Sequence, residues 1–310
     1  MAVFWGTNYS IVKRAFSEID PTVFNAVRMS IASVLFITLI LVLRRVRNPR
    51  ADAWLPSGGS AAMNGVFHSP EPITSRDWAG LAALGIVGHF LYQYFFINGL
   101  ALTSVANSSL MLAATPVMNA LVTALMGEDQ VSAIHWLGAL LSMAGIYVVV
   151  GQEIHLGAHA VGGDLLMAGA VCCWAAYTIA AGKLMERHSP LEVTGISMAI
   201  GTVLYVTAYS RRLAAVDWSA LSLSTWGAIV YSALFALCIS YTIWYAAVRA
   251  IGSSRTAVYS NLVPIVAMLT AVLFLGEPVS ARKIVGAAAV LGGVALTRVG
   301  RTRLVIPAEE

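Results

Sequence analysis

The amino-acid sequence predicts an all-α membrane protein with ten transmembrane helices, arranged as two inverted five-helix repeats. The first observation behind this prediction is composition. Of 310 residues, 58% are hydrophobic and only 11% are charged, and the mean hydropathy is +0.77. A soluble domain carries about 25% charged residues, which cover its water-facing surface. The second observation is a residue pattern that occurs twice along the chain. We therefore expect lipid to surround most of the molecule.

Ten apolar runs are candidates for membrane-spanning helices, each of which needs about 20 apolar residues. Every backbone polar group inside hydrocarbon must find its partner within the same segment, so the runs are expected to be helical. They cover residues 1–16, 22–43, 78–102, 105–126, 133–150, 165–182, 193–209, 226–248, 256–275 and 284–299. The first run is short, and one interpretation is that the true start lies upstream of Met1.

The repeated pattern divides the chain into two halves. Five residues recur 169 residues later: Trp5, Arg14, Pro21, Met29 and Ile31 return as Trp174, Lys183, Pro190, Met198 and Ile200. Two more recur 148 residues later: Trp78 and Pro116 return as Trp226 and Pro264. Gly127-Glu128 also returns, as Gly276-Glu277. The shift decreases because the first half carries a longer polar loop at 46–76, which we expect to be flexible.

Each predicted repeat contains five spans. The first repeat covers residues 1–151, the second covers 162–303, and residues 155–163 are the expected linker. An odd number of spans per repeat forces the second copy to run upside down relative to the first. An apolar chain built from two such halves is typical of a membrane transporter.

The basic residues indicate the orientation. With a cytoplasmic N-terminus, the loops and helix ends on the inner side contain 12 Lys and Arg residues and those on the outer side contain six. The positive-inside rule therefore places both termini in the cytoplasm, in a bacterial inner membrane. Arg28 is the one basic residue within a span. It is expected either to snorkel to the outer interface or to hold a substrate carboxylate.

Polar side chains are unevenly distributed among the spans. They are concentrated in three spans and their repeat partners, at 1–16, 78–102, 105–126, 165–182, 226–248 and 256–275. Because polar groups in hydrocarbon are costly and tend to face a cavity, these six spans are expected to surround a central pathway. The other four are expected to face outward. Small residues in two of these, 133–150 and 284–299, indicate close helix packing, either within one chain or between two copies.

The polar spans supply the candidate site. His89 shares a helix face with Tyr92 and Gln93, where it either contacts substrate or exchanges a proton, or is satisfied by a neighbouring group. Inward-facing aromatic rings would form a lining suited to planar ligands, and the alternative is that they anchor the protein in lipid. The predicted substrate-binding residues are Trp5, Asn8, His89, Gln93, Trp174, Tyr177, Tyr241 and Trp244.

Two prolines occupy equivalent positions in the two halves. Pro116 and Pro264 each lie within an apolar run, where proline removes a backbone hydrogen bond. They are interpreted as paired hinges, with static kinks as the alternative.

Several kinds of chemistry are not supported by the sequence. No acidic residue lies deep within a span, and there is no phosphate-binding G-x-x-x-x-G-K-[ST] motif, catalytic triad or metal-ligand spacing. We therefore expect no enzyme activity, no cofactor, no metal and no nucleic-acid partner. The three cysteines, Cys172, Cys173 and Cys238, are expected to be small buried hydrophobic residues.

The opening Trp5-Gly6-Thr7-Asn8-Tyr9, followed by Pro21 and Arg28-Met29, resembles that of EamA-type members of the drug/metabolite transporter superfamily. So do the repeat ends, Pro116…Met126-Gly127-Glu128 and Pro264…Leu275-Gly276-Glu277. The layout resembles the YddG-type aromatic amino-acid exporters. This resemblance implies ten helices, cytoplasmic termini and a central substrate cavity. The long loop at 46–76 and the short first span depart from the family pattern.

The sequence is thus expected to encode an alternating-access exporter of amino acids, with bulky or aromatic side chains, and related small metabolites. Transport is expected to be facilitated diffusion or weakly proton-coupled through His89. The alternatives are a same-fold exporter of drugs or nucleotide-type metabolites and, more remotely, a membrane-embedded enzyme or receptor. The expected partners are the small-molecule substrate and the lipid bilayer, and the protein is expected to be a monomer or a homodimer.

Overall fold

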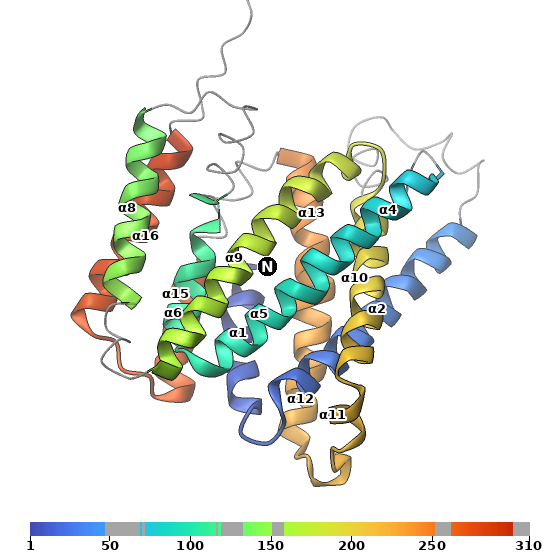
Figure 1. The fold of residues 1–310 in the computed structure, drawn as a ribbon, viewed down its shortest axis with the longest axis horizontal. Coiled ribbons are helices and arrows are strands. Elements are labelled where there is room, and N and C mark those ends of the chain that lie inside the picture. The colour runs from blue at the N-terminus through green and yellow to red at the C-terminus, as the bar shows by residue number, and fades with distance from the viewer. Residues whose placement is uncertain are drawn as a thin grey trace, which may run out of the picture.

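The regular structure of the protein is helical throughout the residues that the computed structural model describes (Figure 1), which are 1–46, 69, 72–115, 117–118, 133–150, 158–251 and 262–299. The α-helices are α1 (Ala2–Ala15), α2 (Pro21–Val46), α4 (Ser75–Leu84), α5 (Tyr92–Leu102), α6 (Val105–Ala113), α8 (Ala133–Val150), α9 (Ala158–Met185), α10 (Pro190–Ala208), α11 (Ser210–Ala214), α12 (Leu223–Tyr231), α13 (Ser240–Ile251), α15 (Leu262–Leu275) and α16 (Ala281–Val299). A short 3-10 helix, η3 (Trp218–Ala220), precedes α12. The predicted all-helical class is confirmed.

Two π-helices continue the α-helices on either side of them. The first, η1 (Gly85–Leu91), joins α4 to α5, and the second, η4 (Ser232–Ile239), joins α12 to α13. Each π-helix therefore lies in the middle of one long helical segment. The two π-helices occupy corresponding parts of the two halves under the 148-residue shift.

Within the described part of the chain, five helical segments are long and apolar enough to cross a membrane. They are Pro21–Arg45, Ser75–Leu102, Val161–Met185, Pro190–Ala208 and Leu223–Ala247, and Trp136–Val148 and Leu262–Leu275 are shorter apolar helices. Each agrees in position with a predicted run. Parts of the runs at 105–126 and 256–275 lie outside the described residues.

The helices pair in a way that follows the repeat. Helix α1 packs against α15, and the corresponding pair is α9 against α6. In the same way α10 packs against η1, and α2 packs against η4. The helices α2 and α10 also pack against each other, as do α8 and α16.

The helices α2 and α10 both start with an N-cap hydrogen bond from a backbone N–H to a side-chain oxygen. Asp20 Oδ1 accepts a hydrogen bond from Thr22 N at 2.8 Å. Ser189 Oγ accepts one from Glu192 N at 3.2 Å. In both helices proline follows the capping residue, at a position where its missing N–H costs nothing. The two helix starts, 169 residues apart, are therefore fixed by equivalent side chains.

The helices α2 and α10 run antiparallel and are tied together along their length. Arg44 Nη2 lies 2.7 Å from Glu192 Oε1 at one end of the pair. Arg212 Nη1 lies 3.1 Å from Asp20 Oδ2 at the other end. Between the two ends, Ser33 Oγ and Thr202 Oγ1 share a hydrogen bond of 2.8 Å.

The prediction that all four barer spans face outward is wrong for 193–209, the core of α10. The most apolar stretch of α10 is 61% buried, more than that of any other candidate span in the described part of the chain. The most apolar stretch of α2 is 39% buried, so α2 has one buried side and one exposed side. The buried polar residues of the two helices are Thr22, Asn25, Arg28, Ser33, Glu192, Thr194, Ser197 and Thr202.

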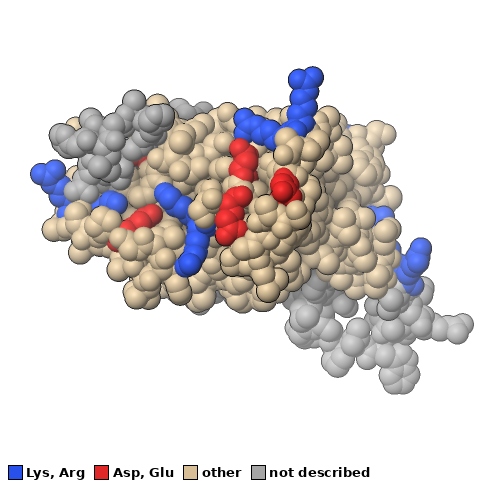
Figure 2. Space-filling view, turned by 90° about the horizontal axis from the view of Figure 1, so that it is seen from below, with Lys and Arg blue, Asp and Glu red and all other residues tan. Residues whose placement is uncertain are grey.

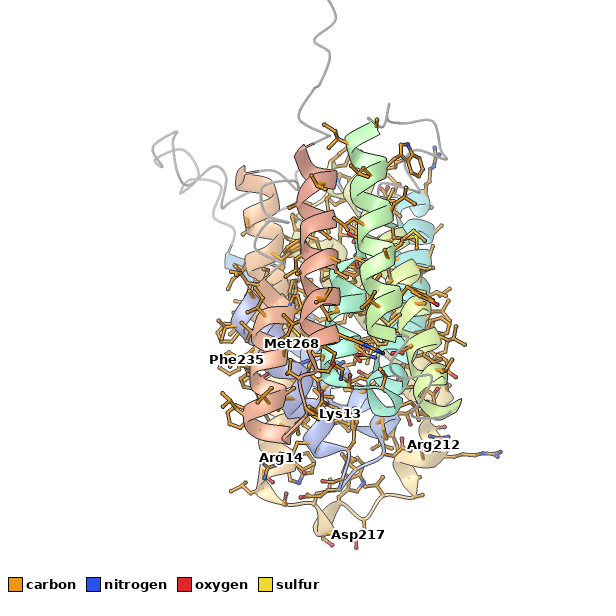
Figure 3. The ribbon with its side chains drawn as sticks, turned by 90° about the vertical axis from the view of Figure 1, so that its left-hand side faces the viewer. Lys13, Arg14, Arg212, Asp217, Phe235 and Met268 are labelled. Carbon is orange, nitrogen blue, oxygen red and sulfur yellow. The ribbon has the colours of Figure 1, made fainter. Side chains whose placement is uncertain are left out.

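The helices α8 and α16 do lie at the periphery, where they form a close pair (Figures 1 and 3). A Cβ on Gly145 would lie 2.8 Å from Gly286 O, and a Cβ on Gly293 would lie 2.4 Å from Gly138 O. The small residues in this pair therefore allow close packing within the chain. Large apolar side chains such as Leu140, which is 63% exposed, cover the outer surface.

Charged side chains collect at the ends of the helices. Figure 3 places Lys13, Arg14, Arg212 and Asp217 at the lower end of the molecule. Figure 2, which views the molecule from below, shows charges of both signs on that end face. This distribution leaves the sides apolar and suits a protein whose helix ends emerge from a membrane.

Two local predictions are wrong. The expected linker 155–163 is partly helical, because α9 begins at Ala158 and Thr103 Oγ1 donates to Asp164 Oδ1 at 2.6 Å, which holds the start of α9 against the end of α5. The cysteines are not buried: Cys172 is exposed, and Cys173 and Cys238 are half-buried. Adjacent residues on a helix point about 100° apart, so Cys172 and Cys173 cannot both face the interior.

Candidate functional site

Aromatic side chains from four helical segments meet in the interior. Trp174 on α9 lies 5.7 Å from Tyr241 on α13 and 5.0 Å from Tyr92 on α5, measured between ring centroids. Trp5 on α1 lies 5.9 Å from Tyr241 and 5.6 Å from Trp244. We call the connected rings of Trp5, Tyr92, Trp174, Tyr177, Tyr241 and Trp244 the aromatic cluster. Its members come from both halves of the chain.

One side of the aromatic cluster is partly open. Tyr177 is fully buried and Tyr241 is 4% exposed, whereas Trp5, Trp174 and Trp244 are only half-buried. A small pocket lies next to Tyr241 and is also lined by Phe36, Pro190, Leu191, Thr194, Thr242 and Tyr245. The cluster thus offers flat apolar faces that are packed on one another and accessible at an edge.

The two π-helices position the aromatic cluster. The indole Nε1 of Trp5 donates to Ala236 O of η4 at 2.9 Å. On the other side, Tyr177 rests on η1 at Gly88, where a Cβ would lie 2.1 Å from the Tyr177 ring. Gly88 and Ala236 are equivalent under the 148-residue shift. The same position of each π-helix therefore supports an aromatic residue from the other half.

His89, on η1, lies beside this cluster. Its ring centroid is 5.1 Å from that of Tyr177, and the side chain is fully buried. Neither ring nitrogen has a hydrogen-bond partner within the described ranges. The alternative interpretation, in which a neighbouring carbonyl or hydroxyl hydrogen-bonds to His89, therefore finds no support among these residues. A buried polar ring without a partner has the capacity to bind a ligand.

Gln93 binds the buried side chain of Arg28. Arg28 is 1% exposed, and its Nη2 donates to Gln93 Oε1 at 2.8 Å. The prediction that Arg28 snorkels to the outer interface is wrong, because its side chain extends along the interior face of α2. Its Nε donates to Asn25 Oδ1 at 2.8 Å and its Nη1 to Ser232 Oγ at 2.7 Å.

The structure joins six of the eight predicted residues through ring contacts: Trp5, His89, Trp174, Tyr177, Tyr241 and Trp244. Gln93 follows the cluster residue Tyr92 on α5. Asn8 is buried one helical turn after Trp5, and its Oδ1 has no partner in the described part of the chain.

The predicted set omits Tyr92, Arg28 and Ser232. Tyr92 shares the predicted helix face of His89, and this shared face could have identified Tyr92 as a site residue. For Ser232 the sequence carries no such signal, because its role depends on packing between distant helices.

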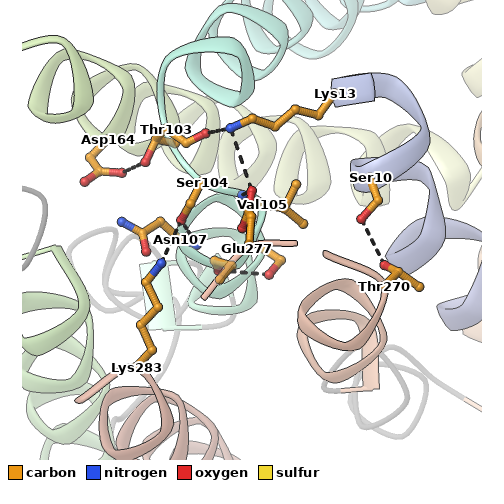
Figure 4. A network of polar contacts seen from close by, with 12 residues as sticks. Ser10, Lys13, Thr103, Ser104, Val105, Asn107, Asp164, Thr270, Glu277 and Lys283 are labelled. Atoms are coloured by element: carbon orange, nitrogen blue, oxygen red, sulfur yellow. Dashed lines mark hydrogen bonds and ion pairs between the residues drawn. The ribbon is translucent and has the colours of Figure 1, made fainter. Parts of the chain in front are cut away.

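A polar network joins the ends of several helices (Figure 4). Lys13 on α1 donates to Thr103 O and lies 3.9 Å from Glu277 Oε1. Glu277 also accepts a hydrogen bond of 3.0 Å from Val105 N, which caps α6. Lys283 on α16 donates to Ser104 Oγ at 3.4 Å. The network links α1, α6, α9 and α16 and so ties both halves together at this end.

The structure describes one of the two predicted hinge prolines. Pro264 is buried near the start of α15, and Pro116 lies outside the described residues. Within the described part of the chain, no group of three or more His, Cys, Asp or Glu side chains is placed to hold a metal ion.

Comparison with known proteins agrees with the geometry. The EamA-like transporter family model matches the chain twice, over residues 1–151 and 161–299. Uncharacterized transporter YyaM of Bacillus subtilis is 24% identical over 306 residues, which cover 98% of this chain and 92% of the relative. An uncharacterized transporter of Archaeoglobus fulgidus is 22% identical over 291 residues, which cover 94% and 93% respectively.

A solved crystal structure has the same fold. It superposes with a TM-score of 0.64 at 20% sequence identity, over 97% of this chain and 95% of the other. The family match over nearly the whole chain, together with the apolar helices and their peripheral charges, identifies a multi-pass membrane transporter. The chain belongs to the EamA-like transporter family.

Proposed function

We propose that this transporter exports amino acids with bulky or aromatic side chains across the bacterial inner membrane by alternating access. The observation that carries the proposal is the aromatic cluster, built by α1, α5, α9 and α13. It is bordered by His89, whose ring nitrogens have no hydrogen-bond partner among the residues that the structure describes. Stacked and edge-on rings bind planar apolar groups well, and a few convergent polar groups orient the ligand. Trp5, Asn8, His89, Gln93, Trp174, Tyr177, Tyr241 and Trp244 form the proposed site.

The proposed architecture is ten spans in two inverted repeats, residues 1–151 and 162–303, with both termini in the cytoplasm. The matched pairs α1–α15 and α9–α6 support it. The excess of basic residues on the proposed cytoplasmic side supports the orientation. In this arrangement the two halves rock about a fixed site, and Pro116 and Pro264 serve as hinges.

The ring chemistry also fits planar drugs or nucleotide-type metabolites, which gives a second candidate function. A counterflow assay with purified protein in proteoliposomes separates the two. We expect labelled phenylalanine and tryptophan to exchange faster than alanine, and faster than a planar drug or a nucleoside. Preferential exchange of the drug or nucleoside would favour the second function, and exchange of none of these compounds would contradict both.

A matched pair of variants locates the site. Trp174→Ala removes the central ring of the aromatic cluster, and we expect phenylalanine counterflow to fall at least about tenfold, since aromatic contacts and buried area are both lost. Trp136→Ala removes a ring that is 43% exposed on α8 and should leave counterflow unchanged. Equal flux in the two variants would contradict the proposed site.

Transport is driven either by the substrate gradient alone, as facilitated diffusion, or also by a proton gradient weakly coupled through His89. A pH gradient across the proteoliposome membrane distinguishes these. If His89 exchanges a proton, the gradient stimulates flux in the wild type and not in His89→Gln. With facilitated diffusion, the gradient leaves both unchanged.

A further inference from the structure

Arg28 is a charged side chain buried in the interior of a membrane protein. It lies in the second turn of α2, is 1% exposed, and is one of the largest fully buried side chains among the described residues. A buried charge in a membrane span is costly, and such residues usually face a partner or a substrate pathway. The contacts of Arg28 indicate which of these applies.

The partners of Arg28 in the described part of the chain are neutral. Its three hydrogen bonds go to an amide oxygen of Asn25, an amide oxygen of Gln93 and the hydroxyl of Ser232. The rings of Phe24 and Phe96 each lie 5.9 Å from its guanidinium carbon. None of these groups carries a negative charge at neutral pH.

The two terminal nitrogens of Arg28 are held from different helices. Ser232 is the first residue of the π-helix η4, and Gln93 follows directly after η1 and Tyr92. Each supplies one neutral oxygen, at 2.7 Å to Nη1 and 2.8 Å to Nη2. A carboxylate presents two oxygens to the same pair of nitrogens, in a bidentate geometry that is stronger than hydrogen bonds to neutral acceptors. Gln93 and Ser232 thus supply neutral acceptors to the two terminal nitrogens that a carboxylate would bind.

Arg28 has no counterpart in the other half. The 169-residue shift places Ser197 at the equivalent position, also buried but uncharged. The contacts that fix the fold, such as Ser33 with Thr202, are in contrast made by equivalent residues. A charge present in one half only is better explained by an asymmetric ligand than by the architecture that the halves share.

Arg28 also lies next to the aromatic cluster. Phe96, one of its ring contacts, stacks on Tyr92 at 5.8 Å, and Tyr92 lies 5.0 Å from Trp174. A ligand with an aromatic group on the cluster therefore has a cation within reach at the other end.

We propose that Arg28 is the anion subsite of this transporter, where its guanidinium binds the carboxylate of the substrate while the cluster binds the apolar side chain. The inference rests on the proposed function and narrows it: the carboxylate of the substrate is required. In the conformation seen here, Gln93 and Ser232 satisfy the guanidinium. In the loaded state, the carboxylate replaces them.

Equilibrium binding to the purified full chain tests this inference separately from transport. The quenching of tryptophan fluorescence reports binding near the cluster, and the two probes are L-phenylalanine and L-phenylalaninol, whose hydroxymethyl group replaces the carboxylate. We expect the wild type to bind phenylalanine at least about tenfold more tightly, the gain typical of a charge-assisted pair. Arg28→Gln should lose this preference by weakening phenylalanine alone. The exposed Arg212→Gln should retain it.

Two further variants keep the test decisive if Arg28→Gln does not fold. Arg28→Lys keeps the charge but not the bidentate geometry, so the preference should fall several-fold. Ser232→Ala frees Nη1 and should preserve or increase the preference. An unchanged preference in Arg28→Gln, or in Arg28→Lys together with a loss in Ser232→Ala, would overturn the anion subsite.

Binding of the two probes to the wild type distinguishes failure of the anion subsite from failure of the proposed function. Equal binding of both probes would overturn the subsite and leave the aromatic site in place. Binding of neither probe would overturn the proposed amino-acid substrate, and the subsite with it.

Discussion

Ser33 and Thr202 hydrogen-bond to each other at 2.8 Å, and they are 169 residues apart, the same interval at which the sequence pattern repeats. Residues that are equivalent in two repeats can touch only where the axis relating the repeats passes between them. Ser142 and Val290 give a second such point: Ser142 Oγ donates to Val290 O at 3.1 Å across an interval of 148 residues. Under the proposed inverted repeat, the two contacts would lie on a common axis through the α2–α10 and α8–α16 pairs.

The Ser33–Thr202 contact is expected to stabilise the α2–α10 pair. In a double-mutant cycle, Ser33→Ala and Thr202→Val should each leave a buried hydroxyl without its partner, and the double variant should cost less than the sum. The expected coupling is about 0.5–1.5 kcal/mol. Thermal unfolding of the four purified proteins in one detergent measures it, and strictly additive effects would show that the contact contributes nothing.

Close packing of α8 and α16 is expected to depend on Gly293. In Gly293→Ala the added methyl group would meet backbone atoms of α8, since a Cβ there lies 2.4 Å from Gly138 O. The variant should lose about 1–3 kcal/mol of stability. The neighbouring Gly292→Ala is the control, because its Cβ would approach only Leu141, at 3.9 Å. Equal melting temperatures for the two variants would contradict this packing.

The support that η1 gives to the aromatic cluster predicts a functional effect at Gly88. A methyl group in Gly88→Ala would displace the Tyr177 ring, which contacts both His89 and Trp174. Phenylalanine counterflow should fall at least about tenfold, because displacing packed rings costs on the order of 1–3 kcal/mol. Gly227→Ala, in α12, introduces a methyl group with no atom within 4 Å and should retain full activity. Normal flux in Gly88→Ala would contradict the proposed role of η1.

The loop between α1 and α2 predicts a pH dependence of stability. Hydrogen bonds from Ser222 and Thr225 hold the pKa of the Glu18 carboxyl below its ordinary value. A carboxyl whose pKa is lower in the folded state stabilises the fold above the unfolded pKa of about 4.3, and this contribution is lost as the pH falls through the folded pKa. The melting temperature of Glu18→Gln should therefore fall less than that of the wild type between pH 6 and acidic pH. Melting temperatures of the wild type and Glu18→Gln that fall in parallel with pH would show that Glu18 does not contribute to this pH dependence.

The helical class and the repeat were predictable because both depend on properties that a single sequence displays directly. Apolar runs of membrane-spanning length have one stable conformation in lipid. The equivalence of Trp5 and Trp174 marked two residues that the structure brings into one cluster through Tyr241. Aromatic and polar residues on the same few helices therefore indicated most of the candidate site.

The remaining features depend on which way individual side chains face. The number of polar residues per helix did not reveal that Asn25, Arg28 and Ser33 all lie on the buried side of α2. A π-helix has no strong sequence signature, so η1 and η4 were not predicted. The packing of the Tyr177 ring against Gly88 of η1 was not predicted either. The partners of Arg28 come from helices up to 204 residues away, which no local pattern reveals.

The aromatic cluster is proposed to lie on a pathway that opens to each side of the membrane in turn, and cysteine accessibility measures this opening. Thr242→Cys, at a half-buried position that lines the pocket next to Tyr241, is introduced after the three native cysteines have been replaced by serine. A membrane-impermeant thiol reagent is applied to right-side-out and to inverted vesicles. We expect modification from both sides, slowed by phenylalanine, and no effect of phenylalanine on a Trp136→Cys control at the exposed surface of α8. Absence of modification from either side, or modification that phenylalanine does not slow, would show that the cluster does not lie on such a pathway.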